Sequence, residues 1–346
     1  MADIGYTFQD TDMNGSSGSR TWIVIAAVVT LATIGVILLV RAFGDEVDGK
    51  PPEAAPAERP AAETAPKPPA ATEAAPAAPS PKEPAVRTPD RKVQPLPEMK
   101  AASERALAFM RAGEAAEKAD DLHAARTNYL AALADPGCGN ARPVAEARLG
   151  VIDVELIFSP REMAGKIDYA IASGDSLKKI ANRFGTTVDL IVKGNAVPNP
   201  DRVQIGDRLR ILDNQVFEIA VSKSRNDLVV TLNGQFFKRY TVGTGKFART
   251  PVGTFKISDK IPEPPWWRPD GKVVPFGDKE NILGTRWMAI AATDGTPPAK
   301  GYGIHGTWDE SSLGQQSSAG CIRMANRDVE ELFTYVPLGT KVVIGE

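Results

Sequence analysis

The stretch that decides the fold runs from residue 302 to residue 324 and reads YGIHGTWDESSLGQQSSAGCIRM. In it, His305 and Cys321 are separated by a polar, glycine-containing loop between two apolar runs that are typical of strands. We expect a hairpin to bring the two side chains together. A thiol is a weak nucleophile until it is deprotonated, and a neighbouring imidazole can take its proton and hold the thiolate as an ion pair. The segment therefore predicts a cysteine nucleophile with a histidine base.

The residues beside Cys321 favour the same chemistry. Arg323 adds positive charge, and Gly320 leaves the approach to the sulfur open and frees backbone N–H groups for a developing oxyanion. A buried cysteine beside a core histidine would not require so many polar neighbours. Ser317 and Ser318 do not stand in a nucleophile-elbow pattern, so we interpret them as polar loop residues.

A mainly-β domain is predicted over residues 216–346. Asn233-Gly234 marks a tight hairpin, and a helix capped by Asn326, with Asp328 in its first turn, precedes a closing strand at residues 342–344. The apolar alternation that indicates the other strands is found in FEIAV (217–221), LVVTL (228–232), FFKRYTV (236–242) and TPVGTFKI (250–257).

The motifs of this domain carry a family resemblance. His305-Gly306-Thr307 and Ser318-Ala319-Gly320-Cys321-Ile322-Arg323-Met324, with Asn326 and Asp328, resemble the YkuD-type L,D-transpeptidase signature, and the upstream segment 250–255, TPVGTF, matches a recurrent family segment. The resemblance implies that the cysteine attacks the carbonyl of the third residue of a peptidoglycan stem tetrapeptide. D-Ala leaves, and an amine takes the acyl group from the thioester. Cell-wall synthesis is the implied process.

The resemblance also implies roles for single residues. Cys321 would be the nucleophile and His305 the base and later the acid, with the backbone carbonyl of Gly306 orienting the imidazole and Arg323 organising the pocket. Thr307, Ser318 and Gly320 would line the substrate site. Family members often have His or Arg where Ala319 stands, so the acceptor is left open.

Trp266 and Trp267 lie in a proline-rich segment, residues 262–275. Exposed paired indoles beside an active site would form a substrate wall or lid. Anchoring in the core is the alternative for the same pair.

Residues 166–212 predict a small α+β module with a strand, two short helices and a closing strand. Asp175 or Ser176 caps the first helix and Thr187 caps the second. The module resembles a LysM domain through Gly174-Asp175-Ser176-Leu177, Ile180-Ala181, Phe184-Gly185, Asn195 and the ending at residues 205–209. The resemblance implies binding to N-acetylglucosamine-containing glycans such as peptidoglycan strands. A spacer that binds nothing is the alternative.

The first 160 residues contain three further segments. Residues 98–160 have the periodicity of an α-helical hairpin similar to one tetratricopeptide repeat, with residues 144–157 as a capping helix and a protein as a conceivable partner. Residues 44–97 hold fourteen of the 28 prolines and are predicted to be a disordered Pro/Ala linker. Residues 1–43 contain a run of nineteen uncharged residues, 22–40, that is long enough for one transmembrane helix. A cleaved signal peptide is the competing interpretation.

The chain is therefore expected to be membrane-anchored, with its catalytic domain on the cell-wall side. Composition limits other functions: 41 Lys and Arg against 43 Asp and Glu give no reason to expect nucleic acid. Cys138, Cys321, His123 and His305 are the only cysteines and histidines, so no cofactor and no Cys- or His-rich metal site are expected, and neither His123 nor Cys138 is given a role. A Cys138–Cys321 disulfide remains an alternative for the two thiols.

Two functional rivals remain at this point. An L,D-carboxypeptidase uses the same Cys321 thioester with water in place of the amine. A non-catalytic scaffold would hold glycan through the LysM module and a partner through the helical hairpin.

Overall fold

The computed structural model of the chain describes residues 93–346. The apolar run 22–40 and the linker up to residue 92 lie outside the described residues. No helix between residues 93 and 346 is long and apolar enough to cross a bilayer.

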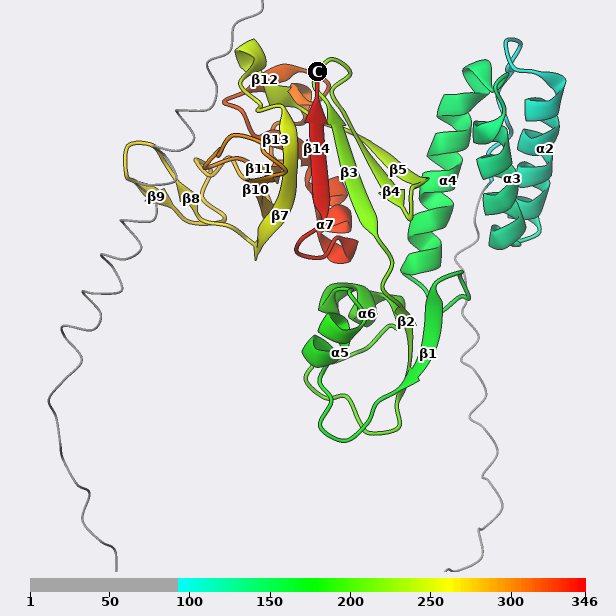
Figure 1. Cartoon of the computed structure of the whole chain (residues 1–346), viewed down its shortest axis with the longest axis horizontal. Helices are drawn as coiled ribbons and strands as arrows, with labels where there is room; N and C mark the ends of the chain where they lie inside the picture. The colour runs from blue at the N-terminus through cyan, green and yellow to red at the C-terminus, as the bar shows by residue number, and fades with distance from the viewer. Residues whose placement is uncertain (1–92) are drawn as a thin grey trace, which may run out of the picture. The chain divides into compact units, whose positions relative to one another are not determined.

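The C-terminal part is built on one eight-stranded sheet with the strand order β13-β11-β10-β7-β14-β3-β4-β5. Two strand pairs, β14 with β3 and β11 with β13, are parallel, and the other pairs are antiparallel. Figure 1 shows β14 between β7 and β3. The strands are β3 (Phe217–Ser222), β4 (Asp227–Leu232), β5 (Gln235–Thr241), β7 (Gly253–Pro262), β10 (Arg286–Thr293), β11 (Gly303–Thr307), β13 (Ile322–Ala325) and β14 (Lys341–Gly345).

Short elements complete this part. Helix α7 (Asn326–Tyr335) packs on β10, β11 and β13. Its apolar face, Val329, Leu332 and Phe333, is buried with a period of three to four residues, as expected for an amphipathic helix. The remaining pieces are β6 (Thr244–Gly245), β8 (Trp266–Trp267), β9 (Val273–Val274), β12 (Gln316–Ser318) and two 3₁₀ turns, η2 (Lys246–Ala248) and η3 (Glu310–Ser312).

Two local predictions in this part have clear outcomes. The Asn233-Gly234 hairpin joins β4 to β5, with both residues at positive φ (51° and 76°), which is the conformation a type I′ turn requires. The predicted cap of α7 is wrong, because Ala325 is the N-cap and the side-chain oxygen of Asn326 instead accepts from Thr285 N–H at 3.1 Å. That bond ties the start of α7 to the loop before β10.

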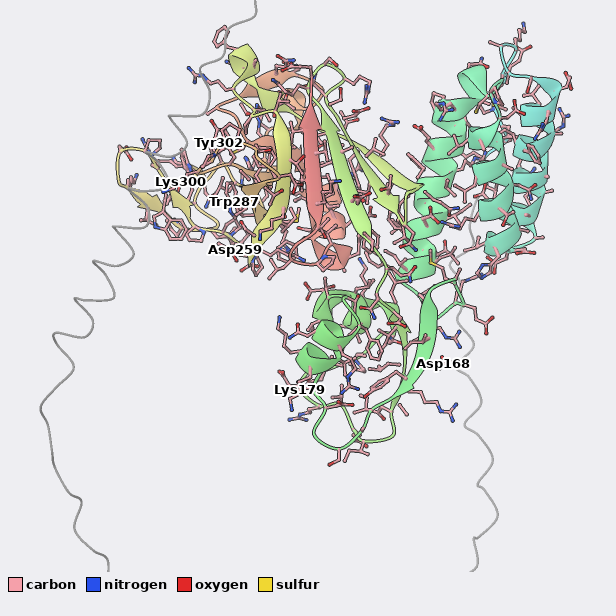
Figure 2. All side chains as sticks on the ribbon, in the orientation of Figure 1. Asp168, Lys179, Asp259, Trp287, Lys300 and Tyr302 are labelled. Atoms are coloured by element: carbon pink, nitrogen blue, oxygen red, sulfur yellow. The ribbon has the colours of Figure 1, made fainter. Side chains whose placement is uncertain are left out.

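The LysM segment forms its own small core. Strands β1 (Lys166–Ala170) and β2 (Arg208–Leu212) pair antiparallel beside α5 (Leu177–Arg183) and α6 (Val188–Gly194). Ser176, rather than Asp175, caps α5, and Thr187 caps α6, in each case by accepting a backbone N–H. Figure 2 places Lys179 on α5 and Asp168 on β1. Seven buried side chains close the core: Ile171, Leu177, Ile180, Ala181, Ile191, Leu209 and Ile211.

The helical segment contains the predicted hairpin, α2 (Glu104–Lys118) and α3 (Leu122–Ala134), followed by a short 3₁₀ turn, η1 (Gly139–Ala141), and the long helix α4 (Arg142–Ile157). Helix α4 lies against β5. Arg239 on β5 donates to both oxygens of Glu146 on α4, at 2.8 and 3.1 Å. The buried residues of the three helices join those of the catalytic sheet in one hydrophobic cluster. The helical segment therefore uses one of its faces on the catalytic part of its own chain.

Candidate active site

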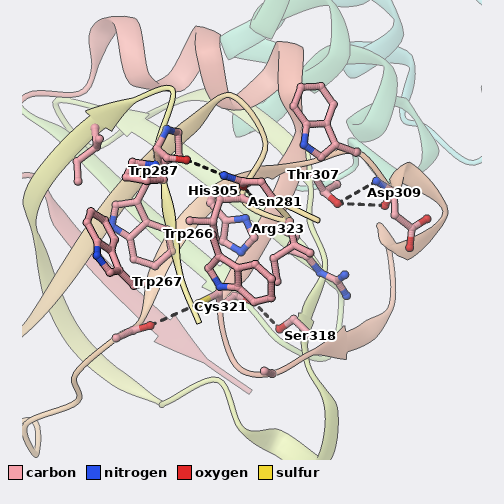
Figure 3. Close-up of a pocket in the computed structure, with 18 of the residues that line it drawn as sticks. Trp266, Trp267, Asn281, Trp287, His305, Thr307, Asp309, Ser318, Cys321 and Arg323 are labelled. Atoms are coloured by element: carbon pink, nitrogen blue, oxygen red, sulfur yellow. Dashed lines mark hydrogen bonds between the residues drawn. The ribbon is translucent and has the colours of Figure 1, made fainter. Parts of the chain in front are cut away.

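A cavity of about 970 Å³ opens beside the end of the sheet that carries β11 and β13. Figure 3 shows its lining, with the sulfur of Cys321 and the ring of His305 facing the same space. One side is aromatic and proline-rich, and the other is polar. The polar lining residues include Thr307, Asp309, Ser317, Ser318 and Arg323.

Neighbouring parallel strands, and not the predicted hairpin, bring Cys321 and His305 together. His305 on β11 pairs with Arg323 on β13, so Cys321, two residues before Arg323, projects from the same face as His305. Parallel strands cannot be joined by a tight turn and need a crossover. Residues 308–321 supply it, through η3 and β12. The prediction of proximity agrees with this arrangement, whereas the prediction of a hairpin is wrong.

The imidazole of His305 is held in one orientation. His305 is 3% exposed, and its Nδ1 lies 2.6 Å from the carbonyl oxygen of Gly306. A carbonyl can only accept, so the proton of a neutral ring sits on Nδ1 and the lone pair of Nε2 is left for the thiol. The indole of Trp287 stacks on the ring, with 5.7 Å between centroids and 26° between planes.

Burial keeps both groups uncharged at rest. Desolvation, together with the charge of Arg323, lowers the pKa of His305 to about 4, against the hydrogen bond to the carbonyl of Gly306. Desolvation also raises the pKa of the Cys321 thiol, against a bond from the Gly303 backbone and the charge of Arg323. The thiol donates to the carbonyl of Gly301 at 3.6 Å. The expected resting ion pair is therefore disfavoured.

The turn before Cys321 is stabilised by Ser318. Its hydroxyl donates to the carbonyl of Cys321 at 2.7 Å and accepts the N–H of Gly320 at 3.0 Å. The Gly320 N–H therefore already has a hydrogen-bond acceptor and is not free to bind an oxyanion, contrary to the prediction. Gly320 has φ +138°, and a Cβ there would lie 2.6 Å from the ring of Tyr302, so only glycine fits.

Arg323 and Thr307 both line the cavity but differ in how far their side chains are already paired within the protein. The guanidinium of Arg323 donates to Ser317 Oγ and lines the cavity, and among residues 93–346 it joins no ion pair with a carboxylate. The hydroxyl of Thr307 accepts the N–H of Asp309 at 3.1 Å, so it stabilises the start of the crossover. Arg323 is thus a cation available to a ligand.

Trp266 and Trp267 form a wall of the cavity and are not core anchors. They pair with β9 in a short hairpin, and Trp267 is 64% exposed. Trp287 and Trp308, the latter 56% exposed, line the same cavity and were not singled out from the sequence. Figure 2 labels Trp287 close to the β8–β9 hairpin. Trp287 lies opposite His305 in the β10–β11 pair, a long-range register that no local sequence pattern signals.

The other cysteine and histidine lie away from this site. Cys138 is buried at 1% exposure in the hydrophobic cluster that includes the helices, and His123 is exposed on α3. Both cysteines are free, so the alternative of a disulfide between them is wrong.

Comparison with known proteins agrees with this geometry. Residues 217–344 match the family model of the YkuD L,D-transpeptidase catalytic domain, and residues 169–212 match the LysM domain. YqjB of Bacillus subtilis, named as an L,D-transpeptidase, is 42% identical over 36% of this chain and 69% of its own length. YkuD of Bacillus licheniformis, with the same activity in its name, is 34% identical over 51% of this chain and 97% of its own.

A solved structure is similar at a lower level. An L,D-transpeptidase from Mycobacterium smegmatis has 19% sequence identity and a TM-score of 0.32, covering 41% of this chain and 65% of that one.

A cysteine and a buried histidine that share one cavity at the end of a β-sheet define a thiol-dependent enzyme. The sequence matches make the class specific: the chain belongs to the YkuD family of L,D-transpeptidases and carries a LysM domain in addition.

Proposed function

We propose that the enzyme forms a thioester between Cys321 and the third residue of a peptidoglycan stem tetrapeptide, releases D-Ala and transfers the acyl group to an amine. The observation that carries this proposal is the pairing of β11 with β13, which puts the thiol and the oriented imidazole on one face of one cavity. The family match supplies the reaction class.

The proton follows the two steps of the reaction. Nε2 of His305 takes the thiol proton as the sulfur attacks the carbonyl, because neither group is charged at rest. The same proton goes to the amine of D-Ala as the C–N bond breaks. In the second step the incoming amine gives a proton to Nε2, attacks the thioester, and the thiolate leaves and is reprotonated.

Two groups stabilise charge in this scheme. We place the oxyanion at the amide of Cys321, because the neighbouring Gly320 N–H is already bonded to Ser318. We assign Arg323 to a carboxylate of the substrate, since its guanidinium lines the cavity without an ion-pair partner among the described residues. Trp266 and Trp267 would contact the apolar parts of the stem peptide.

Mass spectrometry of the intact protein with a carbapenem tests the nucleophile. We expect Cys321→Ala to lose both the adduct and D-Ala release, and Cys138→Ala to retain both, because Cys138 is buried away from the cavity. Circular dichroism checks that each variant folds. An adduct that persists in Cys321→Ala would contradict the assignment.

The products with defined tetrapeptide muropeptides separate the rivals. A dimer whose mass lacks one D-Ala means transpeptidation, whereas a tripeptide alone means that water is the acceptor and the enzyme is an L,D-carboxypeptidase. If the tetrapeptide is unchanged, only the third hypothesis, a non-catalytic scaffold, remains.

We further propose that the LysM domain holds the enzyme on glycan strands and that residues 22–40 anchor it in the membrane, with the catalytic domain on the cell-wall side. The support is the uncharged run and the location of the implied substrate. N-terminal sequencing of the purified mature protein tests the anchor. A start near Asp45 would mean a cleaved signal and a secreted enzyme.

A further inference from the structure

The segment between β7 and β10 is closed at its base by hydrogen bonds. Glu263 N–H donates to the carbonyl of Thr285 at 2.9 Å, so the two ends of the segment meet. Within it, the amide side chain of Asn281 is 1% exposed. Its nitrogen donates to the carbonyl of Pro264 at 2.9 Å and lies 3.3 and 3.2 Å from the carbonyls of Val274 and Pro275. One buried side chain thus joins both arms of the β8–β9 hairpin.

The oxygen of the same amide binds a stretch of backbone that lies beside His305. It accepts the N–H of Leu283 at 2.9 Å. Leu283 is nearly buried and lines the cavity with His305. The next residue packs on the residue that orients the ring: at Gly284, a Cβ would lie 2.5 Å from the carbonyl carbon of Gly306, whose oxygen lies 2.6 Å from Nδ1 of His305.

We propose that Asn281 is a positioning residue for the transfer reaction: it fixes the Trp266–Trp267 wall and, through the backbone of Leu283 and Gly284 packed on Gly306, the imidazole of His305. The inference rests on His305 acting as the base of Cys321. An amide side chain suits this position because its nitrogen donates and its oxygen accepts. The nitrogen faces the carbonyl of Pro264, and the oxygen faces the N–H of Leu283. The tryptophan wall and the base are therefore held by the same side chain.

The isosteric change Asn281→Asp separates these bonds. The carboxylate keeps the acceptor for Leu283 N–H but turns its second oxygen toward three carbonyl oxygens, where no donor remains. Protonation of that carboxyl returns one O–H donor, so the defect should shrink as the pH falls. Asn281→Ser, which is uncharged and keeps a hydroxyl, is the second variant in case the first does not fold.

The test is the second-order rate of carbapenem acylation of the full chain from pH 5 to pH 8, followed by intact-protein mass spectrometry. In Asn281→Asp we expect a loss of about 10- to 100-fold at pH 8, the size of a small misplacement of a catalytic group. The ratio of variant to wild-type rate should rise toward pH 5. With stem tetrapeptide, kcat should fall by a larger factor than KM rises. Asn281→Ser should show a smaller loss without the pH-dependent ratio.

A matched control is Asn226→Asp in the same domain. Asn226 also bonds a backbone carbonyl, Gly314 O at 3.1 Å, and accepts from the hydroxyl of Thr244. It should acylate at the wild-type rate. A purely structural role for Asn281 would lower the fraction of protein that labels but leave the rate and its pH profile unchanged, and that result would overturn the proposal. If wild-type Cys321 is not acylated at all, the proposed active site fails instead.

Discussion

The pKa shifts of His305 and Cys321 disfavour charge on both side chains at rest, and in the proposed mechanism this determines how the rate depends on pH. Burial lowers the pKa of His305 to about 4 and raises that of the Cys321 thiol. A thiolate–imidazolium pair needs the opposite order, with the pKa of the thiol below that of the imidazolium. The imidazole is consequently a free base across the neutral range, and thiolate is scarce.

Alkylation of Cys321 by iodoacetamide should therefore accelerate steadily from pH 6 to pH 9, with no plateau near neutrality, because the thiolate is the nucleophile. The measurement is the pseudo-first-order rate of mass increase, with Cys138→Ala as the background protein so that one thiol reports. A rate that is already maximal at pH 6 would indicate a preformed thiolate–imidazolium pair.

Stability should also depend on the proton of His305. The unfolded ring titrates near 6.5 and the folded ring near 4, so above pH 6.5 the residue adds no penalty. As the pH falls from 6.5 to 4, the ring becomes protonated in the unfolded chain but stays neutral in the folded chain. The free energy of unfolding therefore falls by up to roughly 3 kcal/mol.

His305→Gln removes that contribution. Urea unfolding at pH 7 and pH 4.5 should show a larger acid-induced loss for the wild type than for the variant, since the other groups titrate alike in both proteins. Equal losses in the two proteins would mean that the ring is solvated and that its pKa is not lowered.

At the scale of helices and strands, most local predictions are confirmed, whereas the helix cap at Asn326 and the hairpin between His305 and Cys321 are wrong. The helix caps at Ser176 and Thr187 and the turn at Asn233-Gly234 depend on a few adjacent residues, so the sequence contains all of the relevant information. The strand direction at Cys321 depends on the crossover of residues 308–321 over the sheet edge, which no local pattern encodes.

The same distinction applies to the site. His305 and Cys321 can be proposed from the sequence because few other residues suit their chemistry, whereas Asn281 and Trp287 make their contacts with residues distant in sequence. Asn326 shows the reason. Its residue type is typical of a helix N-cap, but its side chain accepts the N–H of Thr285, 41 positions earlier in the sequence.

The contact of α4 with β5 gives a prediction at this scale. A Cβ on Gly150 of α4 would lie 3.0 Å from Cγ of Lys238 on β5, so a large side chain there must displace the Lys238 side chain from the contact between the helix and the strand. We expect Gly150→Leu to cost about 1–3 kcal/mol of unfolding free energy by overpacking. Gly150→Ala should be close to neutral, because the better helix propensity of alanine offsets the tight contact.

Thermal unfolding followed by circular dichroism and, separately, by loss of carbapenem labelling measures both effects. The two probes should shift together in Gly150→Leu, because the helices and the catalytic sheet share one hydrophobic cluster. A shift in the helical signal alone would mean that the helical segment folds independently.

For the whole molecule, binding to the wall and catalysis should be separable. Ile205 precedes β2 in the LysM domain and is 71% exposed, so its side chain is free to contact a ligand of this domain. Ile205→Glu should reduce retention on insoluble peptidoglycan by about tenfold, the value of one apolar contact, while turnover of soluble tetrapeptide is unchanged.

Pull-down of the full chain with washed peptidoglycan measures this retention. Val216→Glu is the matched control, since Val216 is also an exposed apolar residue, at 58%, and lies outside the LysM match. Equal retention of both variants and the wild type would remove Ile205 from the glycan-binding surface.

The isolation of the two thiols has a consequence for oxidative damage. The chain has two cysteines, and Cys138 is enclosed in the hydrophobic cluster, so Cys321 has no resolving thiol in its own chain. If peroxide converts Cys321 to a sulfenic acid, that acid cannot be trapped as an internal disulfide, and the next step, to sulfinic acid, is irreversible. The working lifetime of the enzyme would then depend on a reductant supplied by another molecule.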